Sequence, residues 1–445
     1  MLKKIFLLLL ICFSIIEIMG QKSAVDFTTV ENRTLKYFNS CHYDSLIRLG
    51  KAALKNHLDY FHLRYRLGYA YFNKKMYRQA AKQFEKARLF NSMDENTLHY
   101  LYYSFKYSGN EAEAMAISKD LAPGYSNKKK ALRKISVLTV YAEGGYGFTD
   151  QIKNNGNIDL DGDTNIYGES NLTRSVTYAH AGFKMKAGKN ISIYQGYSFI
   201  DISKQKNVKR NDNLTKANYD ILQHEYYINS DIRAYKTLVI TPAFHFIYVS
   251  FNEPQYDTAS LSIKRKLREL YNYTGSLMLN KDIWLMKLGL GGTFSYMNDD
   301  YKAQAMASVD FYPLGNLNLY THSFVAFLYE DKSLAHHKSR RFILEQMIGF
   351  KIFNKLWSEL DFTYGDLSNY VEKNAFVIYN FTDKTRFRAE INLISPIFGK
   401  FELSFRYQFF SKQNYYLTYT DYTKFDFKSM NYIQQNIIGG IKWKF

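Results

Sequence analysis

The sequence predicts an α + β multidomain fold, with an α-helical repeat domain followed by an antiparallel transmembrane β-barrel of about 14 strands. Three observations predict it. Small and large residues recur with a period of 34 in the first third of the chain. From residue 136 onward, apolar and polar residues alternate over segments of about ten residues. The connections between these segments are alternately short and long, as in bacterial barrels.

Composition excludes several other classes of protein. The 445 residues include 40 Tyr and 34 Phe but only five Pro, whereas disordered segments are poor in aromatic residues. The two cysteines, Cys12 and Cys41, cannot form a disulfide framework. A surplus of Lys and Arg, 59 against 41 Asp and Glu, could attract nucleic acid. The surplus is not gathered into one patch, so we expect no nucleic-acid partner.

Residues 1–20 have the pattern of a secretory signal peptide. Lys3 and Lys4 precede an apolar run from Ile5 to Met19, and the small residue Gly20 follows it. The run is too short for a membrane-spanning helix, which needs roughly 18 or more apolar residues. We therefore expect the mature chain to begin outside the cytoplasm.

Residues 21–126 are predicted to form about three helical repeats. The central unit, residues 61–94, holds its small and large residues at Leu67, Gly68, Tyr71, Tyr77, Ala80, Phe84 and Ala87. Steps of 34 residues lead from Tyr77 back to Tyr43 and from Ala80 on to Ala114. Small residues let two helices approach, and large ones fill the space between successive hairpins. In their order these residues resemble a tetratricopeptide repeat.

A linker is predicted at residues 127–135. Pro123 and Gly124 end the helical pattern, and a basic stretch follows them. One interpretation is a solvated connection between domains. The alternative is a contact with anionic lipid head groups beside a membrane.

The barrel is predicted to occupy residues 136–445. Phe401, Leu403 and Phe405 alternate with polar residues, as do the apolar residues of the other segments. Soluble sandwiches also alternate, but here the polar face is charged and aromatic residues lie near the segment ends, which favours a membrane barrel. The predicted strands are 137–148, 174–187, 190–203, 218–233, 236–251, 263–280, 283–297, 301–312, 316–330, 338–353, 356–366, 384–396, 399–411 and 430–445.

Connection lengths predict the topology in the membrane. Turns after the even-numbered strands have two to three residues, while most connections after the odd-numbered strands are much longer. In bacterial barrels the tight turns and both chain ends lie in the periplasm. The helical domain is therefore expected to be periplasmic.

The end of the sequence contains a further pattern. Ile441, Trp443 and Phe445 occupy alternate positions of the last predicted strand. They resemble the C-terminal signal by which the barrel insertion machinery recognises outer-membrane barrels. This predicts that machinery and the outer-membrane lipids as partners.

Taken together, the two domains resemble proteins that join periplasmic tetratricopeptide repeats to an outer-membrane barrel, particularly the YaiO-like family. The stretch that includes Gly365, Asp366, Asn369, Tyr370 and Tyr379 is similar to an outer loop of that family before a late strand. Exopolysaccharide export pores and surface-lipoprotein assembly modulators are similar in architecture. The resemblance implies the outer membrane of a Gram-negative bacterium and a periplasmic N-terminal domain. It does not identify a cargo.

A charged cluster is predicted on the lumen face of the last strands. It comprises Glu359, Asp361, Arg386, Arg388, Glu390, Glu402 and Arg406. Opposite charges on neighbouring strands can form pairs that simply satisfy a barrel interior. The alternative is a charged constriction or cargo path. Catalytic carboxylates are disfavoured, because the arginines would keep them ionised.

Other polar residues give weaker patterns. The acidic loop at 159–169 could hold calcium through Asp159, Asp161 and Asp163, or it could be merely solvated. No catalytic spacing joins His180, His245 and His322, and the pair at 336–337 lacks a third metal ligand. We expect no catalytic residues, no metal site and no cofactor.

The concave side of the repeats offers a candidate binding groove. Arg64, Tyr65, His99 and Tyr103 lie on the predicted first helices of the repeats and suit an acidic or extended peptide. The leading hypothesis is that the repeats bind a periplasmic protein or polymer for export, assembly or anchoring of a surface component. The alternatives are an outer-membrane enzyme acting on lipid or glycan, and a diffusion pore.

Overall fold

The computed structural model describes residues 26–118, 120–121, 135–154, 167–188, 190–210, 213–257, 262–332, 337–381, 383–397, 399–419 and 425–445. The predicted signal peptide, nearly all of the linker 127–135 and the acidic loop apart from residues 167–169 lie outside these residues. The chain divides into two compact units, Met1–Ser104 and Phe105–Phe445. Across the described residues, helices are too short or too polar to cross a bilayer.

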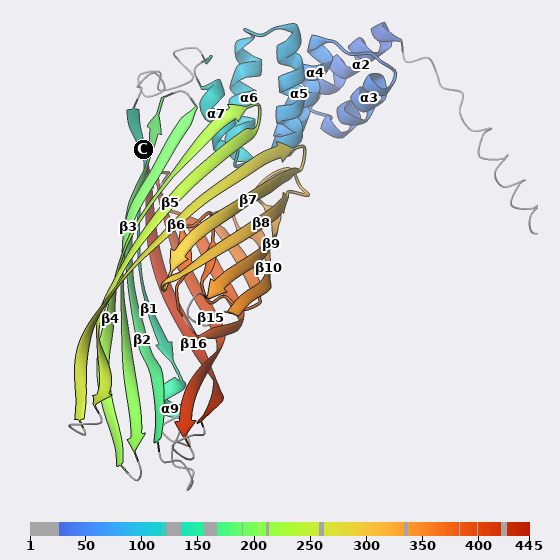
Figure 1. The fold of residues 1–445 in the computed structure, drawn as a ribbon. Coiled ribbons are helices and arrows are strands. Elements are labelled where there is room, and N and C mark those ends of the chain that lie inside the picture. The colour runs from blue at the N-terminus through green and yellow to red at the C-terminus, as the bar shows by residue number, and fades with distance from the viewer. Residues whose placement is uncertain are drawn as a thin grey trace, which may run out of the picture. The chain divides into compact units, whose positions relative to one another are not determined.

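Six consecutive helices begin the described chain (Figure 1). They are α2 (Phe27–Asn39), α3 (Tyr43–Lys55), α4 (Phe61–Asn73), α5 (Tyr77–Phe90), α6 (Glu95–Tyr107) and α7 (Glu111–Ile117). The turns after α2, α4 and α6 each contain one residue in the left-handed conformation, with φ of 57° at Cys41, 59° at Lys75 and 78° at Gly109. These residues are 34 positions apart. The period read in the sequence is therefore a structural repeat of helix, left-handed turn and helix.

Glycines allow the helices of the first unit to pack closely. A Cβ atom on Gly50 would lie 2.6 Å from Leu67 Cδ2, and one on Gly68 would lie 2.7 Å from Phe84 Cε1. Such distances are far below van der Waals contact, so only glycine fits at these crossings. The buried core around them includes Val30, Leu46, Leu63, Leu67, Ala80, Phe84, Ala87 and Leu98.

One buried ion pair joins α2 to α4. The Arg66 guanidinium donates to Glu31 Oε1 at 2.7 Å and to Thr34 Oγ1 at 3.0 Å. Burial alone would raise the pKa of the Glu31 carboxyl, but the hydrogen bond and the charge of Arg66 hold that pKa below its usual value. The pair therefore stays charged at neutral pH and fixes how the two helices cross.

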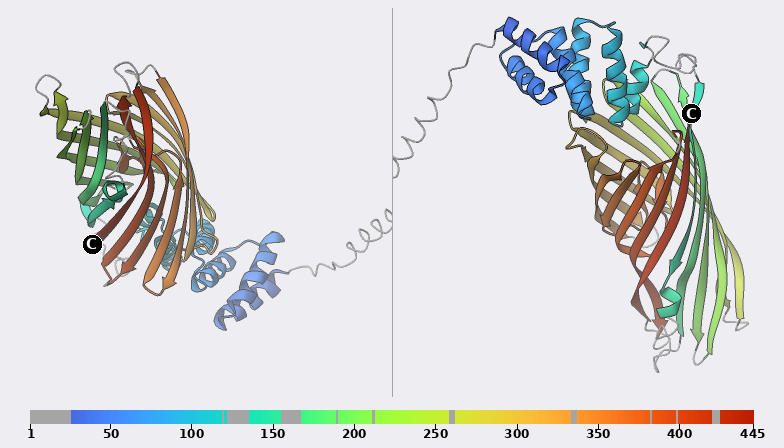
Figure 2. Two further views of the ribbon diagram at one scale, coloured as in Figure 1. Left: turned by 90° about the horizontal axis from the view of Figure 1, so that it is seen from below. Right: turned by 180° about the vertical axis from the view of Figure 1, so that it is seen from behind.

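The second unit contains a closed antiparallel β-barrel of 14 strands, as predicted (Figures 1 and 2). Each strand pairs with its sequence neighbours, and β1 pairs with β16 to close the barrel. The strands are β1 (Ile135–Thr149), β2 (Tyr167–Ala187), β3 (Ile191–Arg210), β4 (Asn213–Tyr235), β5 (Leu238–Asp257), β6 (Ser262–Ile283), β7 (Met286–Met297), β8 (Asp300–Phe311), β9 (Leu319–Lys332), β10 (His337–Phe353), β11 (Leu356–Tyr364), β14 (Lys384–Pro396), β15 (Phe401–Tyr419) and β16 (Phe425–Lys444).

The outer surface of the barrel is apolar. On β7 the side chains of Leu288, Leu290 and Phe294 are exposed, whereas Thr293 and Ser295 are buried inside. The same alternation runs along the other strands. Among the described residues, the exposed ones include Tyr146, Phe148, Phe342, Leu344, Leu403, Phe405, Ile437, Ile441, Trp443 and Phe445. An apolar exterior around a polar interior is the arrangement that lipid requires.

Several strands are much longer than predicted. Residues 204–217 were expected to be a long connection, but β3 has 20 residues and β4 has 23, and they continue to pair through that region. By contrast, β11 has only nine residues. Near its end β15 also pairs with β2, where Leu417 lies opposite Glu169. Much of the predicted outer-loop length is therefore strand, because the pairing of β3 with β4 continues to Arg210 and Asn213 although the segment is rich in Lys and Asn.

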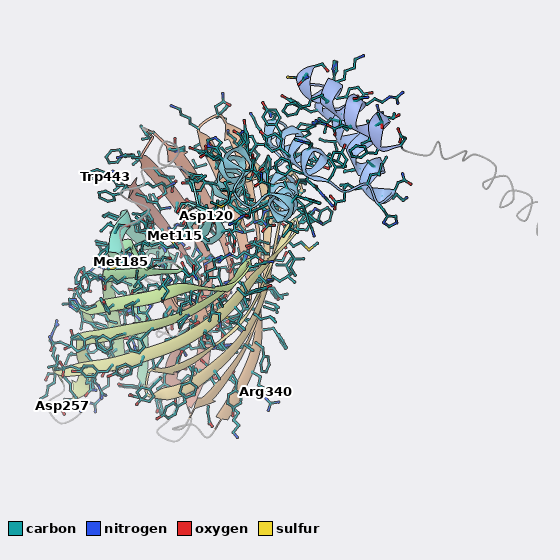
Figure 3. All side chains as sticks on the ribbon, turned by 90° about the horizontal axis from the view of Figure 1, so that it is seen from above. Met115, Asp120, Met185, Asp257, Arg340 and Trp443 are labelled. Atoms are coloured by element: carbon teal, nitrogen blue, oxygen red, sulfur yellow. The ribbon has the colours of Figure 1, made fainter. Side chains whose placement is uncertain are left out.

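The chain enters the barrel unit at the end that carries the short turns. The Glu113 carboxylate of α7 accepts hydrogen bonds from Arg233 Nε at 2.6 Å, Arg233 NH2 at 2.8 Å and the Thr237 backbone N–H at 2.7 Å. Asn110 donates to Asp282 beside the next short turn, at 3.3 Å. In Figure 3, Met115, Met185 and Trp443 lie toward one end of the unit, and Asp257 and Arg340 lie at the other. Helix α7 is thus a fixed part of the short-turn end.

The first prediction concerns this anchor. Replacing Glu113 with Ala removes charge-assisted hydrogen bonds worth about 1.5–3 kcal/mol and leaves Arg233 without its carboxylate. Amide hydrogen exchange in residues 105–121 should become roughly ten- to a hundredfold faster. The control is Glu111→Ala, because that carboxylate is mostly exposed and 3.9 Å from Lys184. Equal exchange in the two variants would contradict the anchor.

Candidate functional site: a hairpin inside the barrel

The connection between β11 and β14 folds into the barrel instead of projecting from it. Its strands β12 (Tyr370–Glu372) and β13 (Val377–Tyr379) form a two-stranded sheet of their own. We call residues 365–383 the lumen hairpin. The sequence placed this stretch in an outer loop, and that expectation is wrong, because its apolar and polar side chains find partners on the inner wall.

The tip of the lumen hairpin is anchored to three strands. Asn374 Oδ1 accepts a hydrogen bond from Ser276 Oγ of β6 at 2.7 Å, and its carbonyl accepts one from the Tyr227 hydroxyl of β4 at 3.1 Å. His245 Nδ1 of β5 lies 2.6 Å from the Ala375 carbonyl oxygen. These bonds hold the turn deep inside the barrel, near the start of β5.

The tip is also strained. Lys373, Asn374 and Ala375 have φ values of 50°, 56° and 65°. None is glycine, and the left-handed region costs an L residue with a Cβ roughly 1–2 kcal/mol. The anchoring bonds therefore compensate for an unfavourable backbone, which is the kind of strain found at sites that switch conformation.

Apolar contacts cover both faces of the lumen hairpin. Val371 and Ile378 pack in one cluster with Ile247 and Met297 of the wall. Tyr370 belongs to a second cluster, whose other members are Met306, Ala326, Ile343, Leu367, Tyr379 and Phe410. Inward-facing apolar side chains are unusual in a polar lumen. Here they exist because the hairpin covers them.

Arg388 of β14 is the main charged contact of the lumen hairpin. Its NH1 atom donates to Glu372 Oε2 at 2.5 Å and to the Tyr379 hydroxyl, and that hydroxyl donates to Glu372 at 2.8 Å. Its NH2 atom donates to Thr363 Oγ1 at 2.9 Å and to Asp361 Oδ1 at 3.3 Å. The Arg388 side chain is only 1% exposed. Buried charge of this kind is stable only while all its partners are present.

A second arginine holds the base of the hairpin. Arg341 of β10 donates to Asp366 Oδ2 at 2.9 Å and to the Ser368 carbonyl at 2.6 Å. It also lies 2.8 Å from Glu330 of β9, which accepts a hydrogen bond from Asn369 at 3.0 Å. Base and tip are thus fixed independently.

The predicted lumen cluster is only partly one group. Asp361 and Arg388 are in direct contact, as expected. Glu390 lies 3.7 Å from Arg406, which in turn donates to Glu143 of β1 at 2.9 Å. These side chains line the wall beside the hairpin.

Glu359 and Glu402 have separate partners. Glu359 accepts hydrogen bonds from the Tyr320 hydroxyl at 2.5 Å and from Asn392 at 2.8 Å. Glu402 pairs across the ladder with Lys442 at 2.8 Å and Lys444 at 2.6 Å. Both are satisfied by neighbouring strands, away from the hairpin.

Arg386 does not belong to the cluster. The β14–β15 register shifts between Thr385 and Phe387, which leaves Arg386 as the extra residue of a bulge. A bulge reverses the alternation of side chains, so Thr385 is buried and Arg386 is exposed. Strict alternation counted along the sequence could not detect this.

Sequence reasoning missed Glu372, Tyr379 and Glu345. Glu345 lies 3.9 Å from Arg388 on β10, and the other two come from the lumen hairpin. One pattern could have indicated the hairpin. Val371 and Ile378 are apolar, flank a short polar turn and would be costly in a solvated outer loop.

The histidines have structural partners. His180 lies 2.9 Å from Ser198 Oγ and 2.6 Å from the Tyr194 hydroxyl. His322 Nδ1 lies 2.5 Å from Asp310, and His245 holds the hairpin tip. Among the residues that the structure describes, no three His, Cys, Asp or Glu side chains are arranged to hold a metal ion.

The predicted groove residues all lie in the first unit. Arg64 of α4 donates to Asp59 at 2.7 Å and to Gln83 at 2.8 Å, so its charge is already paired. The Tyr65 ring is half-buried, and the His99 ring lies 4.8 Å from that of Tyr103. Burial lowers the pKa of His99, so this group is mostly neutral at pH 7 and adds little positive charge.

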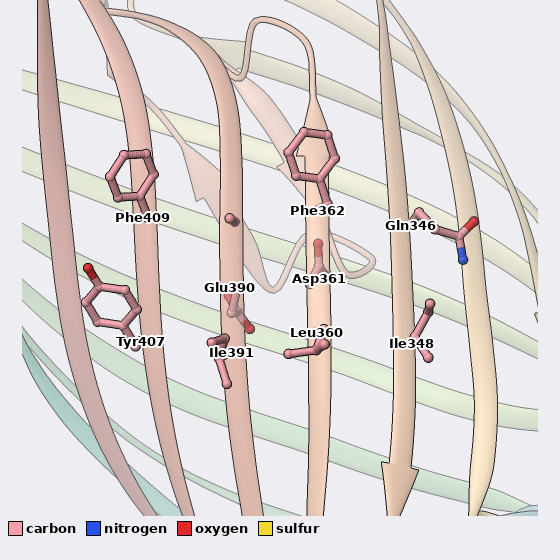
Figure 4. Close-up of a pocket in the computed structure, with 10 residues that line it drawn as sticks. Gln346, Ile348, Leu360, Asp361, Phe362, Glu390, Ile391, Tyr407 and Phe409 are labelled. Carbon is pink, nitrogen blue, oxygen red and sulfur yellow. The ribbon is translucent and has the colours of Figure 1, made fainter.

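A shallow depression marks the outer face of β10, β11, β14 and β15 (Figure 4). Its apolar lining consists of Ile348, Leu360, Phe362, Ala389, Ile391, Tyr407 and Phe409. Leu360, Phe362 and Ile391 are exposed on the barrel exterior. The depression therefore belongs to the lipid-facing surface and is separate from the lumen hairpin.

No protein-family model and no curated protein matches the chain. Among solved structures, the TodX deltaS2S3 mutant monoaromatic hydrocarbon channel has a TM-score of 0.44 and 9% identity, over 70% of this chain and 91% of that one. A Pseudomonas aeruginosa FadL homologue has a TM-score of 0.42 and 8% sequence identity, and the match covers 77% of this chain and 94% of that one. The Acinetobacter baumannii outer membrane protein Omp33 has a TM-score of 0.31 and 8% sequence identity, and the match covers 69% of this chain and 99% of that one. The fold itself follows from the strand pairing of this chain, which closes a 14-stranded antiparallel β-barrel.

The second prediction tests the role of Arg388. Arg388→Met leaves Asp361 buried without its cation and leaves Glu372 with only Lys373, 3.3 Å away, at a cost of about 3–5 kcal/mol. The hairpin should leave the wall, and trypsin should then cut after Lys373. Fragments are identified by mass spectrometry of the folded protein. Arg386→Met, on the same strand but exposed, should leave Lys373 uncut. Cleavage in both variants or in neither would contradict the role of Arg388.

Proposed function

We propose that the protein is an outer-membrane pore of a Gram-negative bacterium and that the lumen hairpin is its gate. One observation carries the proposal: a strained, non-covalently held hairpin fills a barrel whose inner wall is otherwise polar. Inward side chains such as Gln223, Thr274, Ser295 and Gln408 form hydrogen bonds with one another or with the hairpin. Water could replace the hairpin as their partner with little net cost, because such exchanges are worth about 1 kcal/mol each.

The gate requires two states of similar free energy. The closed state gains the Arg388 and Arg341 contacts and the covered apolar surface. It bears the backbone strain at Lys373, Asn374 and Ala375, which costs roughly 1–2 kcal/mol at each residue. The favourable contacts and the unfavourable strain oppose each other. This supports an equilibrium between the closed and the open state, which a solute can shift by binding the open state.

The third prediction concerns conductance. A variant in which residues 368–381 are replaced by a short Gly-Ser linker should conduct ions steadily in planar bilayers. The wild type should show lower and intermittent conductance, because the hairpin fills the lumen. Equal conductance in the two proteins would contradict the gate.

A crosslink provides the matched control. Ser276 Oγ and Asn374 Oδ1 are 2.7 Å apart, so cysteines at these two positions can be joined by a short crosslinker in a Cys41→Ser background. Crosslinking should abolish the intermittent openings, and cleaving a reducible crosslinker should restore them. Openings that persist while the crosslink is intact would contradict movement of the tip.

A second candidate function is supported by an aromatic row on the helices. Phe38 of α2, Tyr69 of α4 and Tyr100 of α6 are half-buried and follow one another at ring distances of 4.9 and 5.2 Å. They lie on the first helix of each successive pair, where a repeat array of the tetratricopeptide kind has its concave face. This placement and the YaiO-like resemblance support a periplasmic domain that binds a protein or polymer partner beside the pore.

The fourth prediction tests this binding. Arg64→Glu should reduce the partners that co-purify with the full-length protein from outer membranes, because it reverses a charge on α4, the helix that carries Tyr69. It also breaks the pair with Asp59. Asp59→Ala breaks the same pair but keeps the positive charge, so it should recover partners normally. Equal recovery in all three proteins at matched barrel levels would contradict the groove.

A further inference from the structure

The end of α5 carries an exposed apolar patch that the pore does not use. Leu89 and Met93 are each 74% exposed and Phe90 is 53% exposed. They are neighbours in the sequence, because Leu89 and Phe90 end α5 and Met93 lies in the turn before α6. Single exposed apolar residues are common, but three large ones together indicate an interaction site.

Two lysines extend the same face of the helix. Both lysines are exposed. Lys82 lies seven residues before Leu89 and eight before Phe90, and Lys86 lies three and four residues before them. That spacing places all of them on one side of α5, opposite the buried Ala80, Phe84 and Ala87. A face with lysines beside large apolar side chains is typical of helices that lie in the interface of an anionic membrane.

The whole unit has the charge expected for such a surface. Between residues 26 and 104 there are 13 Lys and Arg against seven Asp and Glu. Each Lys or Arg held near an anionic bilayer contributes about 1 kcal/mol of attraction. An acidic protein partner would use the charges but would not need three large apolar side chains beside them.

The chain that follows the first unit is bound to the barrel at its short-turn end. Asn110 and Glu113 are bound to Asp282, Arg233 and Thr237, next to the exposed aromatic residues Tyr235 and Trp284. Exposed Tyr and Trp at strand ends mark the membrane interface. Along the chain, little more than the 13-residue helix α6 separates Met93 from this anchor.

We infer that Leu89, Phe90 and Met93 insert into the leaflet next to the short turns and that Lys82 and Lys86 bind anionic phospholipid head groups. The first unit is thus attached to the bilayer as well as to the barrel. This attachment does not depend on whether the barrel conducts.

The test uses the full chain in lipid nanodiscs. An environment-sensitive fluorophore is placed on Met93→Cys in a Cys41→Ser background, and on Asn56→Cys as an exposed control position. Bilayers contain phosphatidylcholine alone or mixed with phosphatidylglycerol, each with and without lipids that carry a quencher on the acyl chain. The label at 93 should be quenched and its emission blue-shifted, most strongly with phosphatidylglycerol. The label at 56 should respond to neither.

Charge reversal isolates the head-group contact. Lys82→Glu with Lys86→Glu should remove the extra quenching that phosphatidylglycerol gives at position 93. Quenching that is equal in both bilayers would overturn the anionic-lipid contact. No lipid quenching at position 93 in either bilayer would overturn the insertion, and a blue shift without lipid quenching would assign the patch to a protein contact instead.

Discussion

The buried contact between Arg388 and the lumen hairpin is the interaction on which the interior of the barrel depends. A guanidinium that is 1% exposed is tolerable only because Glu372, Asp361 and Tyr379 surround it. Two of these partners come from the hairpin and one from the wall. The same contact therefore satisfies the charge of the wall and fixes the hairpin against it.

The apolar part of the lumen follows from the same arrangement. Ile247, Met297 and Ile343 point into a barrel and would face water if the hairpin were outside. Covering them is favourable by roughly 1.5–3 kcal/mol for each fully buried side chain. This gain explains how a turn with three left-handed residues can be held in place. In the proposed gate, opening would expose this apolar surface again.

The last of the N-terminal helices, α7, is bound to the barrel by specific contacts as well as by the chain. Helix α7 is attached to the short-turn end through Glu113, while the helices before it have a core of their own. The division after Ser104 lies before the predicted linker 127–135. The last helix of the repeat pattern therefore belongs to the barrel unit, because its carboxylate is bound by Arg233 and the backbone of Thr237.

Periodicity alone determined the helices, the 14 strands and the apolar exterior. Both periods can be read from short stretches of sequence. Each helical repeat must bury the same positions against its neighbour, and each strand must present apolar side chains to lipid. The structure agrees with both periods: left-handed turns recur at Cys41, Lys75 and Gly109, and alternate side chains of β7 point outward. The wall residues Asp361 and Arg388 were also predictable as inward charges, since they follow the alternation.

Only the tertiary structure decided where the connection after β11 lies and which charges meet. Glu345 and Asp361 lie on barrel strands, whereas Glu372 lies in the connection between two of them. Glu372 shares Arg388 with the other two only because the hairpin runs through the lumen. Arg386 leaves the cluster because one extra residue in β14 reverses the alternation. Both outcomes depend on packing between segments distant in sequence, which a count of alternating residues cannot register.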